Sequence, residues 1–113
     1  MRYNTLYYVN RLLDFILMSK QSTESVKKRL LISGRVQGVS YRYSMAEVAT
    51  RIGAKGWCRN LSDGRVEALI QGTPEQIEKL VQWCHQGPPS AMVTDIQEGQ
   101  LYPHEETTNH TRF

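Results

Sequence analysis

The sequence has few of the residues from which metal centres and disulfide frameworks are built. Its 113 residues include only two cysteines, Cys58 and Cys84, which form no CxxC pair, and three histidines scattered toward the C-terminus. This spacing indicates neither a metal site nor a histidine cluster, so we expect no metal ion and no other cofactor. Both cysteines lie in apolar stretches and are predicted to be small buried hydrophobic residues, although a disulfide stays open.

The sequence also has no large excess of charge of one sign and no long apolar run. Fourteen Lys and Arg against eleven Asp and Glu give a net charge of +3, which suits an anionic ligand and an ordinary protein surface equally well. No apolar run approaches the roughly 18 residues that a membrane-spanning helix needs. No small-residue cleavage site of the A-x-A kind follows the N-terminal segment. We therefore expect a cytoplasmic protein with no membrane span.

The first 25 residues hold a short amphipathic pattern that Arg11 and Asp14 interrupt. Its apolar stripe consists of Val9, Leu12, Leu13, Ile16 and Leu17. We interpret residues 1–25 as a flexible or weakly helical extension, with a membrane-surface or partner-binding helix as the alternative. Met18 could open a shorter natural chain, a hypothesis that native peptides from upstream of Met18 would contradict.

The rest of the chain alternates between strand and helix patterns and fits one domain. Period-two alternation predicts strands, and apolar residues at helical spacing predict helices. The first helix is expected to bury Met45, Ala46, Ala49 and Ile52. Before the second helix, Thr73, Pro74 and Gln76 form a capping box. The expected elements are a strand at 26–33, a helix at 41–52, strands at 55–60 and 65–71, a helix at 74–86 and a strand at 91–97.

This order predicts an α+β, ferredoxin-like βαββαβ fold, with an antiparallel sheet and two helices on one face. The domain is expected to span residues 26–98. Residues 99–113 are predicted to be an irregular tail, in which only residues 111–113 resemble a short closing strand. In such a fold the first two strands are parallel and flank the third, so their C-terminal ends lie at one edge, about 10 Å apart. This scaffold serves many functions, so the residues at that edge must indicate the function.

Three features are predicted to meet at that edge. The loop Gly34-Arg35-Val36-Gln37-Gly38-Val39 has two glycines that let the backbone turn back and form an anion-binding nest, although it also fits an ordinary tight connection. Arg42, in the first turn of the following helix, can fork onto two phosphate oxygens. Asn60 ends the second strand, where it is either a functional amide or a turn residue before Ser62-Asp63-Gly64.

These segments resemble the signature blocks of the acylphosphatase family. Residues 34–42 read GRVQGVSYR, similar to G-R-V-Q-G-V-x-[FY]-R, and residues 53–60 read GAKGWCRN, similar to G-x-x-G-W-V-[RK]-N. The resemblance implies hydrolysis of small acyl phosphates to a carboxylate and inorganic phosphate, without a metal or a covalent intermediate. It implies that Arg42 binds the phosphate and that Asn60 orients the attacking water. The implied phosphate cradle is the backbone of Arg35, Val36, Gln37, Gly38, Val39 and Ser40.

The sequence departs from the family pattern in two places. Cys58 stands where the family usually has Val, and residues 99–110 are polar where the family continues toward a closing strand. Two other functions stay open: a non-catalytic phosphate- or partner-binding domain, and an RNA-binding ferredoxin-like domain. The RNA-binding class displays aromatic residues on its sheet, and residues 26–33 and 65–71 contain none. We therefore expect a monomer without a nucleic-acid partner.

Overall fold

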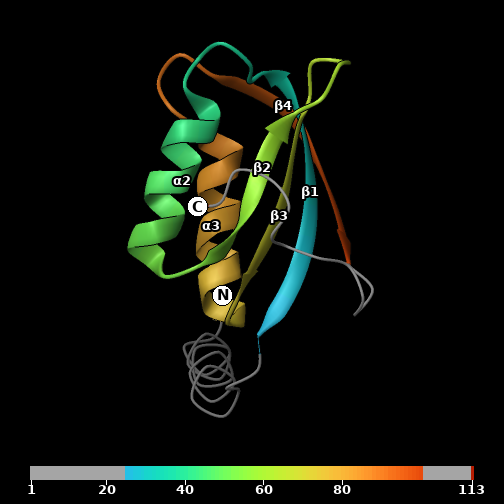
Figure 1. The fold of residues 1–113 in the computed structure, drawn as a ribbon. Helices are drawn as coiled ribbons and strands as arrows, with labels where there is room; N and C mark the ends of the chain where they lie inside the picture. The colour runs from blue at the N-terminus through green and yellow to red at the C-terminus, as the bar shows by residue number, and fades with distance from the viewer. Residues whose placement is uncertain (1–24, 101–112) are drawn as a thin grey trace, which may run out of the picture.

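The computed structural model describes residues 25–100 and Phe113, so the predictions for residues 1–24 and 101–112 lie outside the described residues. The observed element order is β-α-β-β-α-β, as predicted (Figure 1). The elements are β1 (Val26–Arg35), α2 (Tyr41–Ile52), β2 (Lys55–Asn60), β3 (Val66–Gly72), α3 (Pro74–Gln86) and β4 (Met92–Gln100).

The four strands form one sheet in the order β2-β3-β1-β4, and every neighbouring pair is antiparallel. Both helices cover the same face of this sheet (Figure 1). Since β1 and β2 are each antiparallel to β3, they run parallel to one another with β3 between them. This arrangement confirms the predicted ferredoxin-like fold.

The core lies between the sheet and the two helices. Alternate residues of β1 and β3 point into it, because successive side chains of a strand face opposite sides. The buried core residues contributed by the strands and the two helices are Leu30, Ile32, Tyr41, Met45, Ala49, Cys58, Val66, Ala68, Ile70, Ile77, Leu80 and Cys84. The predicted stripe of α2 was wrong at Ala46, which lines a shallow outer depression beside Tyr43 and Glu47. Val48 packs against the core instead, because the buried stripe is centred on Tyr41, Met45 and Ala49.

β1 and β4 are longer than the sequence pattern indicated. β1 continues to Arg35, and β4 includes Gly99 and Gln100, which were assigned to the irregular tail. The two strands pair along this whole length, with an irregularity between Ser33 and Gly34. A Cβ atom on Gly34 would overlap the carbonyl oxygen of Met92, so only glycine permits this close approach. The pairing between β1 and β4 thus extends both strands over polar and glycine residues that have little strand preference of their own.

Phe113 lies beside β2, the edge strand at the other side of the sheet from β4. The backbone N–H of Phe113 donates to the carbonyl oxygen of Gly56 in β2 at 2.9 Å, and its side chain packs against the core. Phe113 is the one described residue of the segment in which a short closing strand was expected. β2 therefore has a backbone partner on its outer side as well as β3.

The helix ends match the residues that predicted them. The Thr73 N–H donates to Gln76 Oε1 at 2.9 Å, and the Gln76 N–H donates to Thr73 Oγ1 at 3.2 Å, which completes the capping box of α3. Gln76 Nε2 also donates to the carbonyl oxygen of Ile52, so the start of α3 is tied to the end of α2. Neither α2 nor α3, the helices of the described residues, is long and apolar enough to cross a membrane.

Candidate active site

The edge where β1 and β2 end gathers the residues that the sequence singled out. Residues 36–40 connect the end of β1 to the start of α2, and Asn60 is the last residue of β2 (Figure 1). Arg42 follows in the first turn of α2. Of the six residues expected to form the cradle, Arg35 is the end of β1, paired with Met92, and the other five form the connection.

The connection is anchored in the core at one end and open to solvent at the other. Val36 is only 1% exposed, and Val39 packs against the core. Gly38 and Ser40 are exposed and have left-handed φ angles of 75° and 65°. For a residue with a Cβ atom, such as Ser40, this conformation costs roughly 1–3 kcal/mol and persists only where the surrounding structure holds it. Such backbone conformations cluster at ligand-binding loops.

The N-terminus of α2 is uncapped. The N-cap residue Ser40 makes no side-chain hydrogen bond to the helix, and the first turn contains no acidic residue. The first bond of the helix runs from the Ser44 N–H to the Ser40 carbonyl oxygen at 3.0 Å. The N–H groups of Tyr41, Arg42 and Tyr43 therefore have no partner within the helix. These donors and the positive end of the helix dipole are available to an anion.

Asn60 is followed by a turn between β2 and β3 that several hydrogen bonds close. The Leu61 N–H donates to the Arg65 carbonyl oxygen at 2.8 Å, and the Gly64 N–H donates to the Leu61 carbonyl oxygen at 3.2 Å. The Asp63 carboxylate accepts from the Arg65 backbone N–H at 3.1 Å and from its Nε at 2.9 Å. These bonds to Arg65 lower the pKa of Asp63. Asp63 and Arg65 thus close the turn, and the Arg65 cation is paired with a carboxylate.

The arginine beside Asn60 in sequence is paired as well. Arg59 Nε lies 2.7 Å from Glu67 Oε1, and the Arg59 guanidinium lies 5.6 Å from the centre of the Trp57 ring. Glu67 is 8% exposed and also lies 3.2 Å from Arg29 Nε. No local pattern in the sequence indicates this buried carboxylate. It forms ion pairs with two arginines of the sheet, so Arg59 is held by the scaffold.

Arg42 differs from these paired arginines. Its side chain is exposed, and it makes no hydrogen bond or ion pair with the residues that the structure describes. A cation in the first turn of a helix is disfavoured by the helix dipole, so folding alone gives no reason for its presence there. The Asn60 side chain is likewise exposed and makes no hydrogen bond within residues 25–100 and 113. No partner among the described residues occupies either side chain, so both can contact a ligand.

Tyr41 and Trp57, the aromatic residues of the two sequence blocks, belong to the scaffold. Tyr41 is 1% exposed, and its hydroxyl donates to the Cys84 carbonyl oxygen at 2.6 Å. Its ring lies 5.4 Å from that of Trp83. Trp57 is also buried. These contacts fix the start of α2 against the end of α3, and so hold the first turn in place.

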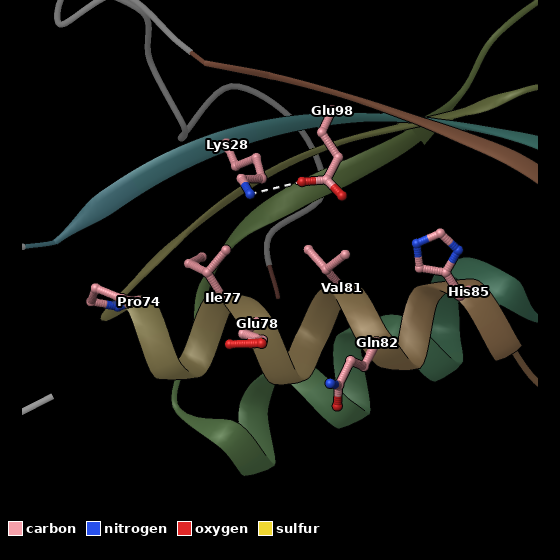
Figure 2. A pocket seen from close by; sticks show the side chains of 8 residues that line it. All are labelled: Lys28, Pro74, Ile77, Glu78, Val81, Gln82, His85 and Glu98. Carbon is pink, nitrogen blue, oxygen red and sulfur yellow. Dashed lines mark hydrogen bonds and ion pairs between the residues drawn. The ribbon is translucent and has the colours of Figure 1, made fainter. Parts of the chain in front are cut away.

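A groove of about 430 Å³ lies between α3 and the strands β1 and β4 (Figure 2). Ile77 and Val81 point into it from α3, and an ion pair of 2.8 Å between Lys28 and Glu98 bridges the two strands above (Figure 2). Lys28 lies near the start of β1, at the far end of this strand from the connection 36–40. None of the residues that line the groove belongs to the connection 36–40, to α2 or to β2, and its lysine is paired with Glu98.

The described residues contain no group of three or more His, Cys, Asp or Glu arranged to hold a metal ion. The polar groups at the candidate site are instead cations and hydrogen-bond donors, which match an anion such as a phosphoryl group.

Comparison with known proteins identifies this arrangement. The family model described as Acylphosphatase matches residues 28–113. The chain belongs to the acylphosphatase family. An acylphosphatase of Thermococcus kodakarensis is 54% identical over 72 residues, which cover 64% of this chain and 79% of that protein. The solved structure of an acylphosphatase from Coxiella burnetii superimposes with a TM-score of 0.69 at 30% identity, covering 80% of this chain and 95% of that chain.

The chain is therefore an enzyme of the acylphosphatase family, and its sequence and fold both support hydrolysis of acyl phosphates. A further similarity reaches full-length HypF in a phosphate- and nucleotide-bound form. That match has a TM-score of 0.66 at 25% identity and covers 73% of this chain but 11% of that chain. An acylphosphatase-like fold thus also occurs as a small part of a longer protein.

The two buried cysteines predict a loss of stability at alkaline pH. Both are free thiols, and burial raises the pKa of Cys58 to about 11 and that of Cys84 to about 12, from an ordinary value of 9.0. Above about pH 9 the unfolded chain releases thiol protons that the folded chain keeps. The free energy of unfolding should therefore fall as pH rises, by about 1.4 kcal/mol per pH unit for each thiol. Burial also raises the pKa of the Tyr41 hydroxyl, which acts in the same direction.

Urea unfolding at pH 7, 9 and 10.5 measures this dependence. The expected result is a constant midpoint from pH 7 to about pH 8.5 and a steep decrease beyond pH 9. In Cys84→Ala, which is less stable at every pH, the decrease should be shallower because one of the titrating thiols is absent. A free energy of unfolding that stays constant to pH 10.5 would contradict the assignment.

Proposed function

We propose that this enzyme hydrolyses acyl phosphates by in-line attack of water on phosphorus. In this proposal Arg42 and the backbone N–H groups of residues 35–40 hold the phosphoryl group, and the Asn60 side-chain amide orients the water. The observation that carries the proposal is the uncapped N-terminus of α2, with an exposed Arg42 in its first turn that has no ion pair among the described residues. Asn60 lies at the end of β2, on the same side of the sheet as the end of β1, and β3 lies between the two strands.

The chemistry needs only these groups. A carboxylate is a good leaving group, so its departure needs little help from a general acid. The remaining tasks are to neutralise charge on the transferring phosphoryl group and to align the water with the bond that breaks. Phosphoryl transfer depends mostly on such positioning and electrostatics. Arg42 and the N–H groups serve the first task, and Asn60 serves the second.

The reaction proceeds in one displacement. A bond forms between the water oxygen and phosphorus while the bond between phosphorus and the acyl oxygen breaks, and the carboxylate leaves with the electron pair. A side-chain amide is not a base, so we propose that the water proton passes to a phosphoryl oxygen of the substrate. A pH profile of kcat that requires an enzyme base near pH 7 would count against this route.

Hydrolysis of benzoyl phosphate in the presence of EDTA tests the proposal. We expect turnover with the same kcat before and after chelation, because charge neutralisation comes from Arg42 and backbone donors. Loss of activity on chelation, restored by a divalent cation, would contradict the metal-independent mechanism. A folded wild type that binds phosphate without turnover would favour a binding domain, as the similarity to a small part of HypF allows.

The acyl group itself is expected to have little influence on binding, since the proposed contacts are to the phosphoryl group. Cytoplasmic location, a monomeric state and the lack of a nucleic-acid partner stay predictions from the sequence. A salt-dependent shift of RNA at micromolar protein would contradict the last of these.

A further inference from the structure

The side chain of Gln37 joins the phosphate-binding connection to the turn that carries Asn60. Its Nε2 donates to the Leu61 carbonyl oxygen at 2.8 Å and to the Arg65 carbonyl oxygen at 3.0 Å. Leu61 directly follows Asn60, and Arg65 closes the same turn. Both amide hydrogens of one partly buried side chain are therefore used on a segment 24 to 28 residues away.

The two carbonyl oxygens that accept from Gln37 already have hydrogen-bond donors within the turn. The Arg65 carbonyl oxygen also accepts from the Leu61 N–H at 2.8 Å, and the Leu61 carbonyl oxygen accepts from the Gly64 N–H at 3.2 Å. The turn is thus closed by its own backbone, and removal of the Gln37 amide leaves neither carbonyl without a donor. What the Gln37 bonds add is a connection between two segments.

The sheet alone holds these two segments only indirectly. β1 and β2 are not neighbours, because β3 lies between them. Among the hydrogen bonds between described residues, the two bonds of Gln37 are the only ones that join residues 36–40 to residues 60–65. The separation of the phosphate site from Asn60 therefore depends on one side chain in addition to the strands.

We propose that Gln37 is a positioning residue that sets the distance between the bound phosphoryl group and the Asn60 amide. The inference rests on the proposed function, because that function places the phosphoryl group at residues 35–42 and the water at Asn60. Attack in line with the breaking bond tolerates little error, and a misplacement of about 1 Å can cost about 10²-fold in rate. Loss of Gln37 should therefore lower kcat while the phosphate site, which uses other groups, stays intact.

The substitution Gln37→Met tests this, since methionine keeps the length of the side chain and removes both donors. We expect kcat for benzoyl phosphate to fall by about 10- to 10²-fold. The inhibition constant of inorganic phosphate should change by less than about 3-fold, because the Arg42 and backbone contacts remain. Gln82→Met, an exposed position on α3, is the matched control and should leave both values unchanged.

A double-mutant cycle with Asn60→Ala separates positioning from general stabilisation. When the Asn60 amide is absent, Gln37→Met has nothing to misplace and should lower kcat by less than about 3-fold. Wild-type kcat in Gln37→Met would overturn the proposal. So would a loss that multiplies fully with that of Asn60→Ala, or a rise in the phosphate inhibition constant that parallels the loss of kcat.

A readout that needs no turnover keeps this inference distinct from the proposed function. In ¹⁵N-labelled protein, added inorganic phosphate should shift the Asn60 side-chain amide in wild type and in Gln82→Met. In Gln37→Met that shift should shrink, while the backbone N–H signals of residues 37–40 still respond. If wild type lacks activity, the proposed mechanism fails, but these spectra still decide the role of Gln37. An Asn60 amide that ignores phosphate in wild type, or that responds equally in all three proteins, overturns it.

Discussion

Arg42→Ala is expected to lower kcat/KM for benzoyl phosphate by about 10³-fold or more, without loss of stability. An arginine that neutralises a transferring phosphoryl group contributes about 10³- to 10⁵-fold to the rate in other phosphoryl-transfer enzymes. The Arg42 side chain makes no hydrogen bond or ion pair within the described part of the chain, so its removal breaks no such bond there. Steady-state kinetics and urea unfolding of the same preparation measure both quantities.

The sign of the stability change is itself informative. A cation near the N-terminus of a helix is unfavourable by about 0.3–1 kcal/mol at low ionic strength, so Arg42→Ala should unfold at an equal or slightly higher urea concentration. Arg42→Lys keeps the charge but loses the forked geometry, and should recover only part of the activity. Arg51→Ala, at the opposite end of α2, is the control for a general effect of charge. Near-normal activity in Arg42→Ala would contradict the assigned role.

Asn60→Ala is expected to lower kcat by about 10²-fold or more and to leave the inhibition constant of inorganic phosphate within about 3-fold of wild type. The reason is that Asn60 is assigned to the water rather than to the phosphate, and poor alignment of a reactant costs about this much. The Asn60 side chain is exposed, and the residue is held in the sheet by its backbone pairing with Val66. The free energy of unfolding should therefore change by no more than about 0.5 kcal/mol.

Measurement of kcat and of phosphate inhibition on the same variant distinguishes a residue that orients the water from one that binds the phosphate. Leu61→Ala, one residue farther along, changes the neighbouring side chain but retains the backbone that accepts from Gln37, and serves as the control. Should Asn60→Ala weaken phosphate binding as much as it lowers kcat, Asn60 would be a phosphate contact and the water would need another partner.

The sequence by itself determined the order of the elements and the limits of α2, β2 and α3. α2 and β2 have the bounds that periodicity predicted, and the capping box of α3 forms as expected. These features depend on residues close together in the chain: a helix cap spans four residues, and a turn such as Asp63-Gly64 needs only its own backbone preferences. The two sequence blocks were also sufficient to indicate the family, and the family model then matched residues 28–113.

Only the tertiary structure decided which residues beyond these local patterns act together. Polar residues at the end of β4 become a strand because β1 provides the pairing, and Glu67 is revealed as the partner of Arg29 and Arg59 only when the strands are placed side by side. In the sequence Gln37 is one residue of a glycine-containing turn. In the structure its side-chain amide donates to carbonyl oxygens 24 and 28 residues away. Hydrogen bonds and ion pairs between distant segments depend on distances that the fold sets, so no local pattern could assign them.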